Sequence, residues 1–354
     1  MSLTENQRAY LLDLLTTPSP SGFERRAARR WREEAATFAP HVDHDLAGNS
    51  WASNRGGEGL HIVIKGHIDE IGFIVTSIDD NGFLWIDRIG GWGNQVVVGQ
   101  RIIIDGRHGS VSGFIGKNAA HLLKPADREK ITTLSDVWID IGAKDRAAAE
   151  ELVEVGGPAV IDVTPRQLPN DFLVSRSIDN RIGSFIALKV LRSVIERDTP
   201  HRVTALAPSQ EEITMAGAIN AAHNLKPAIV IALDVTHATD YPGADPKVDN
   251  NVSLGGGPVL TRGAAVNQRV FEALRGAAKD AGVPCVVQAA GRNTGTDADG
   301  FRRSGIASAI GLVSIANRYM HSPNEMISLT DVECAITLIS TFVVNLAEAV
   351  DFRN

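Results

Sequence analysis

Several features that would assign this chain to a broad class are absent from its sequence. Only two of its 354 residues are cysteines, Cys285 and Cys334, and neither lies near another Cys or a His at zinc-finger spacing. Both are predicted to be buried thiols in a reducing compartment, because each lies within an apolar stretch. Residues 1–8 lack the basic stretch and apolar run of a signal peptide, and no segment approaches eighteen consecutive apolar residues. These absences predict a cytoplasmic protein.

A strong excess of charge of one sign is absent as well. The 35 Lys and Arg residues are set against 42 Asp and Glu, which leaves a net charge of −7 without a block of like charges. This balance argues against nucleic acid as a partner, and the lack of a long apolar run argues against a membrane. The hydrophobic content of 44% is enough, over 354 residues, to bury the core of one large domain or of two unequal ones.

Short apolar runs alternate with segments of helical period through most of the chain. Residues 60–65 form a nearly continuous run of β-branched side chains, which is typical of a strand buried on both faces. Similar runs are residues 203–207, 228–233, 283–287 and 307–313. The helical segments are residues 184–196, 216–223, 266–281 and 331–349, together with two helices between residues 5 and 38. This alternation predicts an α/β fold with a mixed, mostly parallel sheet flanked by helices.

The middle of the chain has a different pattern. From about residue 71 to residue 163, short alternating strands are separated by Gly-rich turns, with one short helix near residues 147–151. The expected strands include residues 83–87, 96–104 and 137–141. The pattern predicts a small β-rich domain at residues 71–163, inserted into an α/β domain made of residues 1–70 and 164–354.

Acids and histidines follow the predicted strands at the positions where ligands bind. In an open α/β sheet, the loops at the carboxyl ends of the strands leave a crevice lined by residues from several strands. We therefore expect side chains from distant parts of the sequence to converge there. The residues that follow or close these strands are His67, Asp69, Glu211, Glu212, Asp234 and His321, and Asp179 lies where the chain re-enters the α/β domain.

Two histidines with several carboxylates favour a particular kind of metal site. Zinc or cobalt accept such mixed ligands, whereas magnesium and calcium prefer oxygen alone. One carboxylate can bridge two ions about 3.5–4 Å apart. In an irregular turn, Glu211 and Glu212 can point differently, one to a metal and the other to the attacking water. Asp69 can accept the second ring N–H of His67.

Each of these residues has an ordinary structural explanation when it is taken alone. A histidine after a buried strand is more often a packing or capping residue than a ligand, and a Glu-Glu pair is usually solvated surface. His321 precedes Ser322 and Pro323, so it could belong to a turn. Asp234 is a stronger signal, because an acid that closes a run of five apolar residues is costly to bury without a partner. The combination indicates a metal site more strongly than any single residue does.

Nine short segments resemble the tetrahedral aminopeptidases, a family of two-metal exopeptidases in clan MH that includes glutamyl and deblocking aminopeptidases. The resemblance runs nearly end to end, and it implies a zinc-exopeptidase-like α/β fold with an inserted PDZ-like or barrel domain. Some sequences of this kind carry an endoglucanase label. In chain order the segments are PSPSG at 18–22, GHIDEIG at 66–72, GGWG at 90–93, VGQR at 98–101, SIDNR at 177–181, QEE at 210–212, LDVTH at 233–237, GTDA at 295–298 and YMHSP at 319–323.

Carried over residue by residue, the resemblance implies two divalent ions, zinc or cobalt, held by five side chains. Asp179 would bridge the two ions. His67 and Asp234 would complete one site, and Glu212 and His321 would complete the other.

The resemblance also implies a reaction and an assembly. Glu211 would be the general base of a metal-dependent aminopeptidase that removes N-terminal residues from short peptides, and Asp69 would orient His67. The inserted domain would mediate dimerisation, and six dimers would form a hollow tetrahedral dodecamer. The sequence departs from the family pattern after Glu212, where Val-Gly-Leu-Arg-Gly is usual but residues 213–217 read ITMAG, so the preferred N-terminal residue stays open.

Two other functions are compatible with part of this pattern. A glycoside hydrolase could use the paired acids, but it would leave His67 and His321 without a role, and aromatic residues are only 5% of the chain. A metal-stabilised scaffold that has lost its chemistry would need ligands but no base such as Glu211.

Overall fold

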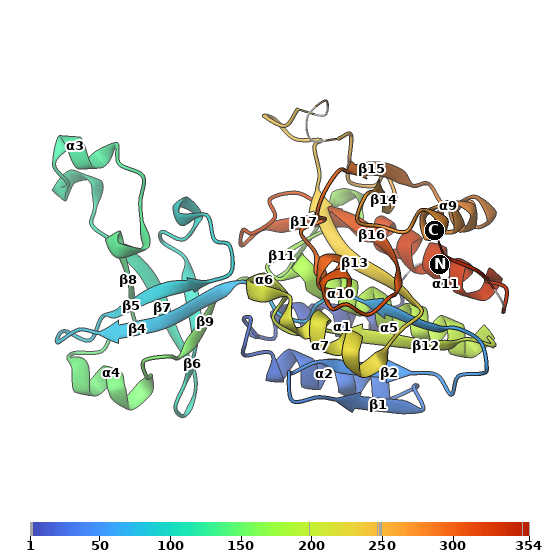
Figure 1. Cartoon of the computed structure of the whole chain (residues 1–354). Helices are drawn as coiled ribbons and strands as arrows, with labels where there is room; N and C mark the ends of the chain where they lie inside the picture. Colours follow the sequence, from blue (N-terminus) through green and yellow to red (C-terminus); the bar gives the residue numbers. More distant parts are fainter. Residues whose placement is uncertain (1–2, 198, 246, 248–249, 349, 354) are drawn as a thin grey trace.

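The computed structural model describes residues 3–197, 199–245, 247, 250–348 and 350–353. These residues form a large α/β unit with a smaller β-barrel beside it (Figure 1).

An eight-stranded sheet forms the centre of the α/β unit, with the strand order β1-β2-β12-β3-β13-β16-β14-β15. The four central strands are parallel, whereas β2 is antiparallel to β12 and β14 is antiparallel to β16. The predicted mixed, mostly parallel sheet is confirmed. The strands are β1 (His41–His44), β2 (Ser50–Ser53), β3 (His61–Lys65), β12 (Arg202–Ala207), β13 (Ile229–His237), β14 (Val259–Gly263), β15 (Val286–Ala290) and β16 (Ala309–Asn317).

Helices cover both faces of this sheet (Figure 1). The helices on one face are α1 (Glu5–Thr16), α2 (Arg25–Ala36), α5 (Ile178–Arg197), α9 (Gln268–Asp280) and α11 (Leu329–Asn345). Those on the other face are α7 (Ala216–Leu225) and α10 (Asp297–Arg303).

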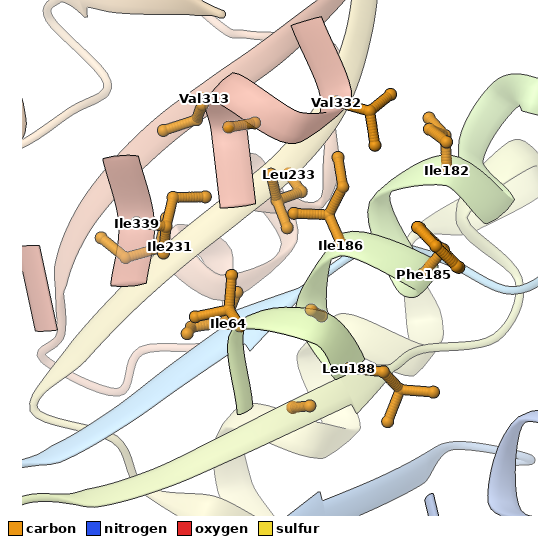
Figure 2. Close-up of a cluster of buried hydrophobic side chains, with 14 of the residues drawn as sticks. Ile64, Ile182, Phe185, Ile186, Leu188, Ile231, Leu233, Val313, Val332 and Ile339 are labelled. Atoms are coloured by element: carbon orange, nitrogen blue, oxygen red, sulfur yellow. The ribbon is translucent and has the colours of Figure 1, made fainter. Parts of the chain in front are cut away.

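Alternate residues of the buried strands point to opposite faces. In β3, Ile62 and Ile64 belong to the core under the larger group of helices, whereas Val63 packs with α7 and α10. In β13, Ile231 and Leu233 lie close to side chains of α5 and α11 (Figure 2). Burial on both faces explains why these strands appear in the sequence as nearly continuous apolar runs.

The predicted strands and helices of this domain are present, but several end at different residues. β13 continues to His237 rather than ending near residue 233, and β16 ends at Asn317 rather than at residue 313. The two strands extend together, because they pair from Ile229 and Ala309 to His237 and Asn317. Continuous hydrogen bonding thus carries both strands past the apolar runs that marked them.

The β-rich insertion contains a closed barrel of six antiparallel strands, in the order β4-β5-β8-β7-β6-β9. Its core includes Phe73, Ile86, Ile104, Ile115 and Ile139. The strands are β4 (Gly72–Ile78), β5 (Leu84–Ile89), β6 (Arg101–Gly106), β7 (Gly109–Lys117), β8 (Val137–Asp140) and β9 (Pro158–Ile161). The short helical elements are η1 (Asn94–Val96), η2 (Ala120–Leu122), α3 (Pro125–Arg128), η3 (Leu134–Asp136) and α4 (Arg146–Leu152), the last at the predicted position.

One strand predicted in this domain was wrong in extent. A strand was expected at residues 96–104, but β6 begins only at Arg101. The preceding residues form η1 and a turn in which Gly99 has a φ of 77°. This left-handed conformation is open to glycine at little steric cost and does not occur in a regular strand. The apolar residues before Gly99 therefore belong to the turn that leads into β6.

A three-stranded sheet in the order β10-β11-β17 joins the barrel to the α/β unit. Its register places Ser175 opposite Glu325. Beside it, Glu70, which directly precedes the barrel, forms buried ion pairs with Arg176 and Arg181. These ion pairs hold together the two chain segments that connect the barrel to the α/β unit, one at Glu70 and the other at Arg176 and Arg181. The elements are β10 (Arg166–Leu168), η4 (Pro169–Asp171), β11 (Phe172–Ser175) and β17 (Glu325–Ser328).

Two expectations about the whole chain can be compared with the structure. Cys285 and Cys334 are free thiols, but both are half-buried rather than buried. Among the residues that the structure describes, no helix combines the length and the apolar character needed to cross a membrane.

Candidate metal centre

The predicted site residues meet at the carboxyl edge of the central strands. β3 ends at Lys65, which is opposite Ala232, while β13 continues beyond it. Asp234 therefore lies inside β13, where it pairs with Ser314 of β16, and does not close the strand as predicted. It projects past the end of β3 and is only 5% exposed.

Asp179 lies between two imidazoles. Its Oδ1 is 3.1 Å from Nε2 of His67, and its Oδ2 is 3.4 Å from Nε2 of His321. His67 follows β3, Asp179 lies at the start of α5, and His321 lies in the loop between β16 and β17. The fold thus brings one carboxylate against imidazoles from two distant segments.

Three overlapping groups of side chains could each hold a cation. In each group, one nitrogen or oxygen atom per residue lies within 4.8 Å of the others. Two of the groups share Asp179, which is the arrangement that a carboxylate bridging two ions requires. The groups are His67 with Asp179 and Asp234, Asp179 with Glu212 and His321, and His67 with Glu211 and Glu212.

Asp69 is buried behind His67 and holds the adjoining loop. Its Oδ1 is 3.3 Å from Nδ1 of His67. The same oxygen accepts a hydrogen bond from the backbone N–H of Glu211 at 3.2 Å, and Oδ2 accepts one from the N–H of Glu212 at 3.1 Å. Asp69 therefore connects the imidazole of His67 to the main chain of the two acids.

Glu211 and Glu212 begin the one-turn helix α6 (Glu211–Thr214), which is bounded on each side by a residue with left-handed backbone. The irregular turn predicted here was wrong, but successive residues of a helix still point about 100° apart. Oε2 of Glu211 lies 3.8 Å from Nε2 of His67, and Oε2 of Glu212 lies 3.5 Å from Nε2 of His321. The two acids thus face different imidazoles.

Burial and mutual repulsion disfavour the ionisation of several acids in this cluster. Burial raises the pKa of Glu211 and that of Glu212 well above the ordinary value, and neighbouring carboxylates add to the rise. Burial also raises the pKa of Asp234 to about 6, although an adjacent lysine opposes the shift. Burial opposes charge on Asp179 as well, but hydrogen bonds with the two imidazoles outweigh it and lower its pKa. A bound cation would reverse the repulsion and keep the acids ionised.

Two buried charged residues beside the cluster were not singled out from the sequence. Lys65 is fully buried, and its Nζ lies 3.5 Å from Oδ2 of Asp234 and 3.2 Å from Oδ2 of Asp297. A lysine at the end of an apolar strand was the available signal, because its ammonium group cannot be buried without a partner. Asp297 lies in the GTDA segment, which was noted only for its resemblance.

Glu325 is a third residue that the sequence did not identify. It is 2% exposed, and its carboxylate accepts hydrogen bonds from the backbone N–H groups of Asp179 and His321. No motif or apolar run marks it in the sequence. Its place follows from the pairing of β11 with β17, which only the folded chain shows.

The cluster opens into a cleft of about 590 Å³. Asp179, Glu211, Glu212, Asp234 and His321 are all among its lining residues, whereas His67 and Asp69 lie behind them. Ile213, Thr214 and Met215, which belong to the segment that departs from the family pattern, also line it. The other lining residues are Gly91, Val235, Thr236, His237, Thr294, Gly295, Thr296, Arg303 and Met320.

The donor set fits divalent cations. It combines imidazole nitrogens with carboxylate oxygens, the mixture that zinc and cobalt accept. Oε1 of Glu212 is buried and accepts no hydrogen bond within the described part of the chain, and Oδ2 of Asp234 has the ion pair with Lys65 but no hydrogen bond there. Buried acceptors of this kind are normally satisfied, so a cation is a natural partner for them.

Known proteins are similar to this chain in sequence. The M42 glutamyl aminopeptidase family matches residues 48–338. Among curated proteins, the candidate aminopeptidase FrvX of Escherichia coli K12 is 32% identical over 303 residues, which cover 84% of each chain.

Solved structures resemble the whole chain. The TET aminopeptidase from the marine sediment archaeon Thaumarchaeota archaeon SCGC AB-539-E09 aligns with a TM-score of 0.92 and 31% identity, covering 97% of this chain and 98% of that one. The TET1 peptidase of Pyrococcus horikoshii, which can assemble into a tetrahedron or a large octahedral shell, aligns with a TM-score of 0.86 and 26% identity, over 96% of this chain and 100% of that one.

Proposed function

Because the chain belongs to the M42 glutamyl aminopeptidase family, we propose that it is a metal-dependent aminopeptidase that removes N-terminal residues from short peptides. The proposed reaction uses two divalent ions and a glutamate as the general base. The single observation that carries the two-metal proposal is the position of Asp179, which belongs to two separate ligand groups. His67 and Asp234 complete one group, and Glu212 and His321 complete the other. Zinc or cobalt fits this mixture of nitrogen and oxygen ligands.

Glu211 is the proposed general base. It lines the cleft but lies outside the two ligand groups that share Asp179. The ions, when bound, supply a water of lowered pKa and polarise the carbonyl of the scissile bond. Glu211 takes the proton from the attacking water and passes it to the leaving amine. Asp69 holds the ring of His67 and the main chain of Glu211 in fixed positions during this transfer.

Self-association is part of the proposal. The barrel domain, residues 71–163, carries exposed apolar side chains, among them Phe114 at 57%, Leu122 at 75% and Ile131 at 70%. A contiguous group of exposed apolar side chains marks a surface that another subunit can cover. The assembly of the similar TET1 peptidase into a tetrahedron or an octahedral shell supports self-association. In this proposal the barrel domain forms the dimers, and six dimers make a tetrahedral dodecamer.

The two alternative functions have less support. A glycoside hydrolase would use two acids without metal, but here the candidate acids lie against the imidazoles of His67 and His321. A scaffold would need only the ligands, whereas Glu211 is kept beside the cluster and faces the cleft.

The experiment that tests the proposal compares substrates and metals together. Purified chain is treated with a chelator, and the hydrolysis of amino-acid anilides and of a cellulose oligomer is followed before and after zinc or cobalt is restored. We expect anilide hydrolysis to disappear on chelation and to return with metal. Anilide hydrolysis that survives chelation would rule out the metal mechanism, and hydrolysis of the cellulose oligomer alone would favour the glycosidase.

A further inference from the structure

A buried carboxylate lies directly against the main chain of two proposed ligands. Oε2 of Glu325 accepts a hydrogen bond from the backbone N–H of Asp179 at 3.0 Å, and Oε1 accepts one from the backbone N–H of His321 at 3.1 Å. Both oxygens of one side chain thus tie together ligands from segments far apart in the sequence.

The main chain of Glu325 is itself fixed from two directions. In the small sheet, Glu325 pairs with Ser175 of β11, which lies just before the start of α5. The next residue, Met326, exchanges backbone hydrogen bonds of 2.9 and 3.0 Å with Arg318. The hydrogen bonds between Arg318 and Met326 therefore join the two ends of the loop that carries His321. Glu325 lies at one of these ends, and its carboxylate points into the loop toward the backbone N–H of His321.

The loop between β16 and β17 needs such a tie because its own backbone is irregular. Tyr319 has a φ of 62° and His321 a φ of 57°, values in the left-handed region that residues with side chains rarely adopt. Such residues stay in place only where the surrounding structure holds them. For His321, the bond from its N–H to Glu325 provides that hold.

We infer that Glu325 is a positioning residue that sets the geometry of the Asp179, Glu212 and His321 metal site. The inference rests on the proposed two-metal function. Two buried carboxylates then hold different ligands of the centre. Asp69 contacts the ring of His67 and the backbone N–H of Glu212, whereas Glu325 accepts the backbone N–H groups of Asp179 and His321. Hydrogen-bonded partners of metal ligands typically change metal affinity by about 10–100-fold when they are lost.

The test is a cobalt titration of the metal-free, full-length chain in competition with a chelator. The nearly isosteric variant Glu325→Gln keeps one acceptor oxygen but turns an amide N–H₂ toward the second backbone N–H, and Glu325→Ala removes both acceptors. Glu333→Gln is the matched control, because Glu333 also accepts a backbone hydrogen bond, from Leu3, at a distance from the site. His321→Ala identifies which binding step belongs to the affected site.

We expect wild type and Glu333→Gln to bind two cobalt ions, and Glu325→Gln to weaken by about 10–100-fold the same step that His321→Ala weakens. The unfolding temperature of the metal-free variant should stay close to that of wild type. Two unchanged binding steps in both Glu325 variants would overturn the inference, as would equal weakening of both steps together with a lower metal-free unfolding temperature. A wild-type chain that binds no cobalt would instead overturn the two-metal proposal on which the inference rests.

Discussion

Asp69 holds Glu212 through the main chain: its Oδ2 accepts the backbone N–H of Glu212 at 3.1 Å, while its Oδ1 faces Nδ1 of His67. Replacing Asp69 with Asn should weaken metal binding or activity by about 10–100-fold, because an amide replaces one of the two acceptor oxygens with an N–H₂ group that cannot accept a hydrogen bond. Metal titration and anilide hydrolysis measure the effect. Asp87→Asn, on barrel strand β5, is the control, since among the described residues the Asp87 side chain accepts a hydrogen bond only from the backbone N–H of its neighbour Arg88. Wild-type behaviour of Asp69→Asn would remove the orienting role.

Glu211 is expected to act on the proton and not on the metal. Replacing Glu211 with Gln should lower kcat by about 10²–10⁴-fold, the usual contribution of a general acid–base group. Metal content should stay at the wild-type value, because Glu211 lies outside the two ligand groups that share Asp179. Elemental analysis and kinetics on the same sample check both statements. Full turnover by the variant would exclude Glu211 as the base.

Asp179 is expected to matter more than any other ligand. Replacing it with Ala removes a ligand from both groups, so neither ion would keep a complete set of ligands and both should be lost. Metal analysis after dialysis measures the loss. Asp171→Ala, which removes a partly exposed partner of Arg8, should retain both ions. Two ions still bound to Asp179→Ala would contradict the bridging role.

Lys65 is expected to stabilise the fold of the metal-free chain. Its ammonium group is fully buried between Asp234 and Asp297, and removing one partner of a buried ion pair usually costs about 3–5 kcal/mol. Lys65→Met should therefore lower the free energy of unfolding by that amount in denaturant titrations. The double variant Lys65→Met with Asp297→Asn should recover part of the loss, because fewer buried charges are left unpaired. A loss below about 1 kcal/mol in Lys65→Met would show that the pair is not a stabilising one.

His61 is expected to make the fold sensitive to acid. Burial, with a smaller contribution from Arg202, lowers the pKa of His61 to about 4, and its ring contacts the carbonyl of Leu225 and the hydroxyl of Thr204. The unfolded chain takes up a proton at this residue near pH 6.5, whereas the folded chain resists it. Stability should therefore fall as the pH decreases from about 6.5 toward 4.

The variant His61→Gln isolates this effect. Its unfolding temperature should decrease less than that of wild type between pH 7 and pH 5, because the proton uptake of the unfolded chain is removed. His223→Gln, at an exposed position of α7, should keep the wild-type pH dependence. An identical pH dependence in all three proteins would exclude His61 as the cause.

The fold could be predicted from the sequence where burial alone decides it. The strands around Ile62 and Ile231 have both faces covered by helices, so their apolar runs were clear. Edge strands lack this signal. β1 reads HVDH and β2 reads SWAS, and β2 exists as a strand because it pairs with β12, far along the chain.

The site shows the same division. His67, Glu212 and Asp234 could be predicted because each lies in or just after a strand whose position the sequence indicates. Lys65 and Glu325 could not be assigned, since their roles depend on what lies opposite them. Lys65 faces Asp297 only because α10 begins at that edge of the sheet, and Glu325 reaches Asp179 only through the register of β11 and β17.

The clasp of Glu70 with Arg176 and Arg181 has a mechanical consequence. Glu70 is followed by the first barrel strand and lies three residues after His67, while Arg176 lies three residues before Asp179. Each of the two chain segments that connect the barrel to the α/β unit thus lies three residues from a proposed metal ligand. A rotation of the barrel against the α/β unit would therefore displace His67 and Asp179 before it displaced the rest of the sheet.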